Sequence, residues 1–277
     1  MHPVLDAYLR FLRRAGLEFS IAPDLVHEDD FTGDLRPSTA KRHHVLSDGF
    51  QLVEALDASQ SIGADHASLS VSTILERHAV ELNGRRVVDV GCGSGFLALV
   101  AAHHGARASG TEIDPRALEL AATNAAANDL QVDWLLSSLV DSIPTRPPID
   151  CFVANLPHKP SDMDSSGELP LAQAGGEGGC ALFEKAFPAM AARQTPGGRV
   201  VFFLHSLPDP RLLCGAAKLY DLVLESWKLR WLGVSEFETS RAFFRERAKS
   251  GRSHLHRDSA RNLEALVCGV WVGTKKN

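Results

Sequence analysis

A glycine-rich turn between two apolar runs constrains the fold of this chain more than any other feature. Residues 86–90 have the composition of a buried strand, residues 91–95 read Gly-Cys-Gly-Ser-Gly, and residues 96–102 form an apolar stretch of helical character. Glycines let the backbone pass close to a bound molecule, and the first turn of a helix presents unpaired N–H groups to it. We therefore predict a strand, a turn and a helix that bind a nucleotide-like ligand, with a purely structural turn as the alternative.

Strand-like and helix-like patterns alternate from this turn onwards. Pro115, after Asp114, marks the start of the helix that follows the second strand, because proline is tolerated at the first helical position. Such alternation is typical of a parallel sheet with crossover helices on both faces. We predict an α/β domain over residues 83–277, with strands at 86–90, 106–111, 132–136, 150–154, 199–204, 222–231 and 265–272.

Residues 1–82 show a different organisation. Apolar side chains recur at helical spacing over residues 4–12, and a second helical pattern over residues 69–79 ends before the turn dipeptide Asn83-Gly84. Between them, Phe50–Leu56 is the most helix-like of the short apolar runs. We predict that residues 1–82 form a small, mostly helical domain that caps the site or recognises the substrate.

The composition restricts the class of protein. Of the 277 residues, 44% are hydrophobic and 23% are charged, which is typical of a globular protein. The net charge of −5 argues against a surface built for the phosphate backbone, so we do not expect nucleic acid as a partner. Membrane spans need about 18 consecutive apolar residues, and the sequence shows no such run and no signal peptide. We expect a cytoplasmic protein without a membrane partner.

Metal-binding patterns are also missing from the sequence. The twelve histidines include pairs at 43–44, 103–104 and 254–256 but no His-Glu-x-x-His motif. No Cys-x-x-Cys pair occurs among the cysteines, so we expect reduced thiols and no metal site. The five cysteines are Cys92, Cys151, Cys180, Cys214 and Cys268.

Two motifs resemble the S-adenosylmethionine-binding half of class I methyltransferases. They are Val87–Gly95, which contains the glycine turn, and Gly110–Pro115, which ends the second strand with an acidic residue. The Gly-x-Gly-x-Gly spacing differs from the Gly-x-Gly-x-x-Gly fingerprint of dinucleotide folds, which argues against NAD. The resemblance implies a Rossmann-like sheet of seven mostly parallel strands and S-adenosyl-L-methionine as the cofactor.

The resemblance also assigns residues to the cofactor. Glu112 lies about twenty positions beyond the turn, where an acidic side chain accepts hydrogen bonds from ribose hydroxyls. Ser138 stands where many relatives have an aspartate that holds the adenine amine, and Trp134 could flank the adenine or pack in the core. The expected cofactor-binding residues are Asp89, Gly91, Cys92, Gly93, Gly95, Glu112, Ile113, Ser138 and Asn155.

The fourth predicted strand ends at Asn155-Leu156-Pro157-His158, where amino-group methyltransferases carry Asn/Asp-Pro-Pro-Tyr/Phe. Ligands of open α/β sheets bind beyond the carboxyl ends of the strands, so the Asn155 carbonyl can accept a hydrogen bond from an acceptor NH2. That contact would align the nitrogen lone pair with the methyl–sulfur bond. We predict Asn155 and His158 as catalytic residues, with His158 a general base, a stacking surface or a polar residue at a loop edge. His205, after the fifth strand, is expected to make a structural hydrogen bond.

Further segments are similar to HemK-like enzymes, which methylate a glutamine side-chain amide in release factors. They are Glu168–Ala172 and the Gly-Gly-Glu-Gly-Gly run at Gly175–Gly179. Leu156 and His158 replace the usual proline and tyrosine, so the acceptor of that branch is not carried over. Residues 235–261 are a basic insertion that could form a solvated helix face, a lid over a substrate carboxylate or phosphate, or a nucleic-acid contact.

Together these features favour an enzyme that transfers the methyl group of S-adenosylmethionine to an amide or amine nitrogen of a small molecule or a protein side chain. One alternative is a cyclase that consumes S-adenosylmethionine, forms a ring of the azetidine-2-carboxylate type and releases methylthioadenosine. The other is an RNA-binding or partner-binding module on a degenerate fold.

Overall fold

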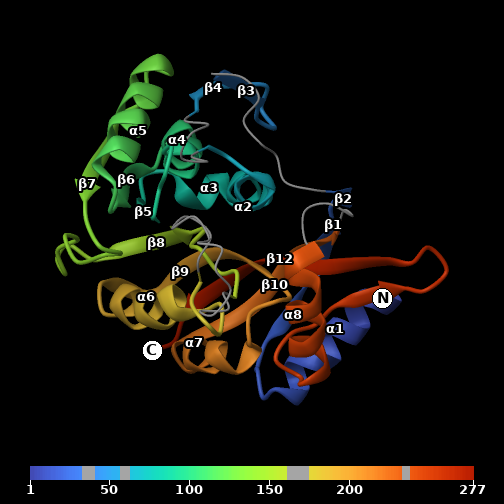
Figure 1. Cartoon of the computed structure of the whole chain (residues 1–277). Helices are drawn as coiled ribbons and strands as arrows, with labels where there is room; N and C mark the ends of the chain where they lie inside the picture. Colours follow the sequence, from blue (N-terminus) through green and yellow to red (C-terminus); the bar gives the residue numbers. More distant parts are fainter. Residues whose placement is uncertain (33–40, 57–62, 161–174, 233–237) are drawn as a thin grey trace. The chain divides into compact units, whose positions relative to one another are not determined.

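The computed structural model describes residues 1–32, 41–56, 63–160, 175–232 and 238–277 (Figure 1). The chain forms two compact units, each assembled from segments that are far apart in the sequence. The first unit consists of Met1–Asp34, Leu156–Phe187 and Leu204–Trp271, and the second of Leu35–Asn155, Pro188–Phe203 and Val272–Asn277. This division differs from the boundary expected after residue 82, and a role of residues 1–82 as a cap stays a prediction.

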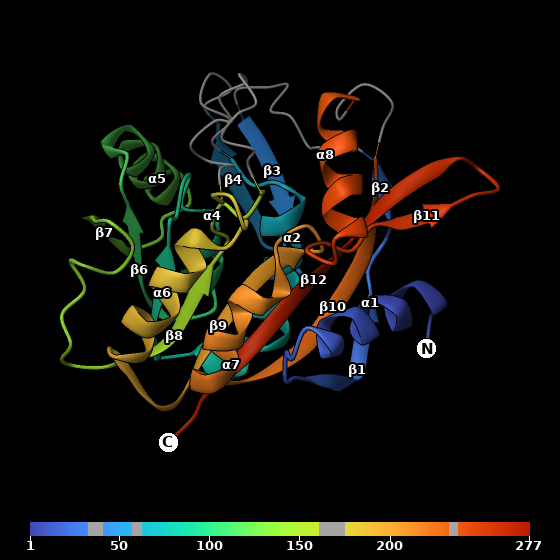
Figure 2. The same ribbon diagram turned by 60° about the horizontal axis from the view of Figure 1, so that its bottom comes forward.

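The second unit contains five neighbouring strands of a sheet, each parallel to the next, in the order β9-β8-β5-β6-β7. Its elements are β3 Lys41–Val45, β4 Gln51–Ala55, α2 His66–Arg77, α3 Ala79–Leu82, β5 Arg86–Val90, α4 Phe96–His103, β6 Arg107–Glu112, α5 Pro115–Ala127, β7 Val132–Leu136, β8 Ile149–Ala154 and most of β9 Gln194–His205. The helices α4 and α5 pack against these strands (Figure 2). Because parallel strands are covered on both faces, they bury their side chains, and Val87, Val88 and Val90 of β5 are at most 1% exposed.

The first unit contains most of the remaining helices and strands. They are α1 Pro3–Arg14, β1 Ser20–His27, β2 Phe31–Thr32, the 3-10 helix Pro210–Leu213, α7 Cys214–Leu219, β10 Tyr220–Trp231, α8 Glu238–Lys249, β11 His256–Asp258 and most of β12 Leu263–Lys275. The helix α6, Ala181–Ala191, begins in this unit and ends in the second. Strands β1 and β2 pair with β10 in parallel, whereas β11 pairs with β12 in antiparallel orientation. The apolar residues of α1 that set its predicted period are buried.

The predicted α/β class, with a mostly parallel sheet flanked by helices, is confirmed. The mostly helical reading of residues 1–82 is wrong, because this part of the chain also forms β1 to β4. Phe50–Leu56, expected to be helical, contains β4, which pairs with β3 in an antiparallel hairpin across Asp48-Gly49. An Asp-Gly dipeptide between apolar runs is a hairpin turn signal, and Gly49 has the positive φ of +87° that such a turn requires.

Two asparagines hold the hairpin, Asn124 of α5 and Asn128 at the C-cap of this helix. The Asn124 amide accepts a hydrogen bond from the Ala55 N–H at 2.7 Å and donates to the Ala55 carbonyl at 3.2 Å. The Asn128 amide accepts from the Val53 N–H at 2.7 Å and donates to the Val53 carbonyl at 2.6 Å. The backbone groups on one edge of β4 are thus satisfied by side chains of a helix.

Trp134 of β7 packs against the backbone of neighbouring elements rather than standing free. A Cβ atom added at Gly110 would lie 2.4 Å from Trp134 Cζ3 and 2.9 Å from Cys92 Sγ, and one added at Gly95 would lie 2.6 Å from Trp134 Cη2. The ring is half-buried and contributes to packing at this place; a position beside the adenine stays a prediction. The glycines at positions 95 and 110 leave the room that it occupies.

We predict that Gly110→Ala lowers the free energy of unfolding by about 1–3 kcal/mol, because overpacking displaces Trp134 or the backbone. Urea denaturation with a fixed m value measures the change. The control is Gly215→Ala in α7, where no atom lies within 4 Å of the added Cβ. It should leave stability unchanged or raise it by up to about 1 kcal/mol. Equal stability of the two variants would contradict this packing.

Candidate active site

The strand register brings the predicted site residues of the second unit to one edge of the sheet. Val90, the last residue of β5, pairs with Thr111 of β6 and with Ala154 of β8. Gly91, Glu112 and Asn155 follow these three residues directly in the sequence. The glycine turn, the acidic residue and the asparagine therefore lie at the carboxyl ends of adjacent strands, where open α/β sheets bind their ligands.

The glycine turn has the backbone conformation that its sequence predicts. Gly91, Gly93 and Gly95 have φ angles of +71°, +53° and +83°, a region that side chains with a Cβ rarely adopt. The N–H groups of Gly91 and Cys92 donate to the Thr111 carbonyl at 2.8 and 2.9 Å. Gly95 is the N-cap of α4, so the turn delivers the chain directly into the first turn of that helix.

The Glu112 carboxylate is held by backbone donors. Its Oε2 accepts a hydrogen bond from the Gly93 N–H at 3.0 Å, and its Oε1 accepts from the N–H groups of Ile113 at 2.7 Å and Asp114 at 3.2 Å. A carboxylate offers about four lone-pair positions, so Oε2 keeps one for a ligand hydroxyl. The geometry is suited to the predicted contact with a ribose.

Two exposed apolar residues adjoin Glu112, one in the sequence and one on the neighbouring strand. Ile113 is 61% exposed and Leu136 is 58% exposed, although both are large hydrophobic side chains. Leu136 pairs with Glu112 across β6 and β7, so both apolar residues lie at the ends of these strands, and the exposed Ser138 follows two positions later. A flat base placed here would cover apolar surface that water now contacts. Leu136 was not among the predicted site residues, because the sequence identified it only as the last residue of the strand 132–136.

Asp89 is placed to support the turn rather than to face a ligand. Its side chain is 2% exposed, and Oδ2 accepts a hydrogen bond from the Ala98 N–H in the first turn of α4 at 3.2 Å. Burial raises the pKa of Asp89 to about 7, opposed by the Ala98 hydrogen bond and assisted by the nearby Glu112 charge. Cys92 is also buried, and burial raises the pKa of its thiol well above its ordinary value.

The Asn155 amide has a defined orientation. Its Nδ2 donates to Asp65 Oδ1 at 3.2 Å and to Ser68 Oγ at 3.0 Å. Asp65 is the N-cap of α2 and accepts from the Ser68 N–H at 2.8 Å. A carboxylate can only accept hydrogen bonds, so the NH2 group of Asn155 must face Asp65. The other amide atom, Asn155 Oδ1, is then available to accept a hydrogen bond. Asp65 and Ser68 were missed in the sequence, since they lie about ninety positions before Asn155.

His158 lies inside the first unit. The ring is 7% exposed, and its Nδ1 lies 2.7 Å from the Leu156 carbonyl, which can only accept a hydrogen bond. Nε2 then accepts from the His205 N–H at 3.4 Å. Both ring nitrogens are engaged by backbone groups, which favours the structural alternative over the general base. His205 itself accepts from the Leu207 N–H at 3.3 Å, and burial lowers the pKa of His205 well below its ordinary value.

The Gly175–Gly179 segment packs on the chain around His158. The Gly175 N–H donates to the Lys159 carbonyl at 2.9 Å. A Cβ atom added at Gly175 would lie 2.7 Å from the His158 Cα, so only glycine fits this approach. The glycine run therefore has a packing role in the first unit, while Glu168–Ala172 lies outside the described residues.

The described part of the basic insertion contains one buried arginine among several exposed basic residues. Arg247 is 5% exposed and donates to the Glu177 carbonyl and to Ser253 Oγ, each at 3.1 Å. Burial lowers the pKa of Arg247. Arg245 donates to Glu264 Oε1 at 2.7 Å. Arg247 thus serves the packing of α8, whereas Lys249 and Arg252 are 75% and 50% exposed, as expected for a solvated face. The lid and the nucleic-acid contact stay untested.

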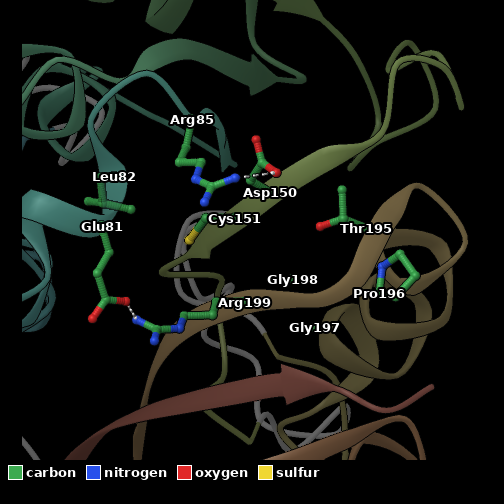
Figure 3. A pocket seen from close by; sticks show the side chains of 10 residues that line it. All are labelled: Glu81, Leu82, Arg85, Asp150, Cys151, Thr195, Pro196, Gly197, Gly198 and Arg199. Carbon is green, nitrogen blue, oxygen red and sulfur yellow. Dashed lines mark ion pairs between the residues drawn. The ribbon is translucent and has the colours of Figure 1, made fainter.

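A cavity of about 420 Å3 lies at the opposite end of the second unit's strands (Figure 3). It is lined by residues at the starts of β8 and β9 and by the chain before β5. Two ion pairs cross its wall, between Arg199 and Glu81 and, at 3.8 Å, between Arg85 and Asp150. Because ligands of such sheets bind at the carboxyl ends, this cavity is separate from the candidate site.

One group of metal-ligating side chain types occurs in the described part of the chain. Asp48, His103 and His104 each place a possible ligand atom within 4.8 Å of the others. Asp48 accepts hydrogen bonds from His103 Nε2 at 2.7 Å and from the Phe50 N–H at 2.9 Å. These bonds account for the cluster, and we assign no ion to it. The expectation of a protein without a metal stays a prediction.

The sequence of the site segment has known relatives. Residues 55–160 match the sequence model of a family described as Ribosomal protein L11 methyltransferase (PrmA). The ribosomal protein L11 methyltransferase of Thermus thermophilus is 33% identical over 130 residues, which cover 44% of this chain and 50% of the relative. That of Pseudomonas aeruginosa (strain LESB58) is 47% identical over 77 residues, 27% of this chain and 26% of the relative. The chain thus spans about a quarter to a half of the length of these relatives.

Solved structures support the fold. The SAM-dependent methyltransferase from Agrobacterium tumefaciens has a TM-score of 0.52 at 13% identity, covering 84% of this chain and 70% of that chain. The YcgJ protein from Bacillus subtilis has a TM-score of 0.50 at 14% identity, covering 76% of this chain and 99% of that chain.

Within the described residues, no helix has the length and apolar character needed to cross a membrane.

The raised pKa of Asp89 predicts a pH dependence of stability. The folded pKa of about 7 exceeds the ordinary value of about 3.9, so the folded state binds this proton more tightly than the unfolded state. Its contribution is complete below about pH 4 and is lost as the pH rises through 7, at up to about 1.4 kcal/mol per pH unit.

The variant Asp89→Asn keeps an acceptor for the Ala98 N–H without a titrating proton. Its free energy of unfolding should increase relative to the wild type between pH 5 and pH 8, as measured by urea denaturation at several pH values. The control Asp133→Asn changes an exposed aspartate of β7. Its free energy of unfolding should change with pH in the same way as that of the wild type. A constant difference between Asp89→Asn and the wild type would show that Asp89 is ionised in the folded protein throughout.

Proposed function

We propose that this protein is an S-adenosylmethionine-dependent methyltransferase that transfers the methyl group to a nitrogen of its acceptor. The observation that carries the proposal is the fixed amide of Asn155. This residue follows β8, the strand beside the one that leads into the glycine turn, and Asp65 accepts from its NH2, so its oxygen is the group left to bind an acceptor. An amide oxygen at this place accepts a hydrogen bond from an N–H group of the acceptor. The matched segment 55–160 contains this amide, the turn and Glu112.

The residues present fit the cofactor. Glu112 would accept from a ribose hydroxyl, Ile113 and Leu136 would cover the base, and Ser138 would lie near its amine. The positive-φ glycines let the turn approach the methionine moiety closely. When bound, S-adenosylmethionine supplies a methyl group already activated by the sulfonium charge.

The chain's own contribution to the reaction is orientation. Asn155 Oδ1 would hold the acceptor N–H so that the nitrogen lone pair lies in line with the methyl–sulfur bond. Exclusion of water from the nucleophile adds to the rate. His158, whose ring nitrogens are bonded inside the first unit, is not needed for this step.

A protein side chain is the acceptor that the relatives favour, since their names designate ribosomal protein L11 as the protein methylated. L11 is therefore the first acceptor to test, although the chain spans only part of these relatives. The glutamine specificity of HemK-like enzymes has weaker support, because it depends on an altered motif and on a glycine run with a packing role. A cytoplasmic location also stays a prediction.

The products formed from S-adenosylmethionine distinguish methyl transfer from cyclisation. We expect S-adenosylhomocysteine to accumulate with L11 present, together with a mass increase of L11 by one or more methyl groups, as measured by liquid chromatography and mass spectrometry. Methylthioadenosine release without any acceptor would instead establish the cyclase. If the chain binds S-adenosylmethionine but forms neither S-adenosylhomocysteine nor methylthioadenosine, other nitrogen acceptors should be tested.

Two substitutions separate cofactor binding from turnover. Glu112→Ala should raise the Kd for S-adenosylmethionine by about 10- to 100-fold, because it removes charge-assisted hydrogen bonds. Asn155→Ala should leave this Kd nearly unchanged and lower turnover by about 100-fold, as expected for a contact made in the transition state. Isothermal titration and single-turnover kinetics measure the two effects. The exposed Glu119 of α5 provides the control Glu119→Ala, and equal loss of affinity in Glu112→Ala and Asn155→Ala would contradict the separate roles.

A further inference from the structure

The carboxylate of Glu54, on β4, is fully buried, with none of its surface exposed. Burying an ionised carboxylate is costly unless hydrogen bonds replace its water. Oε1 accepts from the Ala64 N–H at 2.7 Å and from the Ser94 hydroxyl, and Oε2 lies 2.8 Å from His44 Nε2. Three separate parts of the second unit therefore meet on one side chain.

The first of these partners belongs to the glycine turn. Ser94 lies between Gly93 and Gly95 and is 4% exposed. Its hydroxyl donates to Glu54, and its carbonyl accepts from Asn124 Nδ2 at 2.9 Å. The neighbouring Gly93 N–H donates to Glu112. The shape of the turn is thus set from one side by Glu112 and from the other by Glu54 and Asn124.

The second partner leads to the acceptor amide. Ala64 directly precedes Asp65, the residue that orients Asn155. The Ala64 N–H donates to Glu54, and its carbonyl accepts from Arg42 at 2.7 Å. Both backbone groups of Ala64 are held, so the position of Asp65 at the start of α2 depends on the Glu54 carboxylate.

We propose that Glu54 is a positioning residue that couples the cofactor turn to the Asn155 amide. The inference depends on the proposed function, because it assigns Glu54 a role in that same site. Glu54 acts through Ser94 on the cofactor side and through Ala64 and Asp65 on the acceptor side. Nothing in the local sequence marks it, since it lies forty positions before Ser94.

Isothermal titration of the full chain with S-adenosylmethionine tests the cofactor side. Glu54→Ala should raise the Kd by about tenfold or more, and Ser94→Ala, which removes only the link to the turn, by about fivefold. Glu54→Gln should bind within about threefold of the wild type, because its amide oxygen can still accept from Ala64 and Ser94 while its NH2 faces His44. If Glu54 affected cofactor binding only through its negative charge, Glu54→Gln would raise the Kd as much as Glu54→Ala does.

The matched control is His44→Ala. It removes the other partner of the same buried carboxylate and should lower the unfolding temperature, but it leaves both bonds of Oε1 in place. Its Kd for S-adenosylmethionine should stay within about twofold of the wild type, which separates positioning from general destabilisation. Circular dichroism checks that each variant folds. If Glu54→Ala does not fold, the Kd of Ser94→Ala is compared with that of His44→Ala, and a higher Kd in Ser94→Ala alone supports the positioning role. The double variant Glu54→Ala/Ser94→Ala should lose less affinity than the two single losses combined, since both break one interaction.

The outcomes distinguish this inference from the proposed function. Wild-type affinity in folded Ser94→Ala and Glu54→Ala overturns the coupling role and leaves the proposed function standing. An equal loss in His44→Ala also overturns it, because the effect would then follow stability. A wild-type chain that binds no S-adenosylmethionine overturns the proposed function, and the inference with it.

Discussion

The side chains of Asn124 and Asn128 hold an extended segment as a neighbouring strand would hold it. Four residues of an α-helix rise about 6 Å, and two residues of a strand rise about 6.7 Å, so asparagines four apart can bond to backbone groups two apart. This match lets α5 satisfy Val53 and Ala55 of β4 in succession. It holds the hairpin against α5, and Glu54 of the same strand hydrogen-bonds to Ser94 of the glycine turn.

Backbone groups and carboxylates, rather than flexible side chains, define the candidate site. The glycine turn is tied to the Thr111 carbonyl, to Glu112 and through Ser94 to Glu54. The Asn155 amide is fixed by a partner that can only accept. A site held in this way needs little reorganisation when a ligand binds, and preorganised polar groups of this kind are the usual source of catalytic power. Methyl transfer suits such a site because the methyl donor is already activated and alignment dominates the remaining barrier.

The parts of the site that the sequence predicted are local. The glycine turn, Glu112 and the helix start at Asp114 each depend on neighbours within a few residues, and Asp114 does accept from the Arg116 N–H. Glu54 and Asp65 were missed because their partners lie tens of residues away and become neighbours only after folding. The hairpin was missed although Asp48-Gly49 marks its turn, because the apolar run at residues 50–56 fits a helix and a strand equally well. The burial of His158 could not be read from its motif, since it depends on Gly175 and on the backbone of His205.

The division of the chain into units passes through the Asn-Leu-Pro-His motif. Asn155 is the last residue of a segment of the second unit, and Leu156 is the first residue of a segment of the first. Asn155 is therefore constrained by contacts in the second unit, whereas Leu156 to His158 are constrained by contacts in the first. Among homologues, substitutions at position 155 should covary with positions 65 and 112, whereas those at position 158 should covary with positions 175, 179 and 205. A change of the histidine alone would then be a poor guide to a change of substrate.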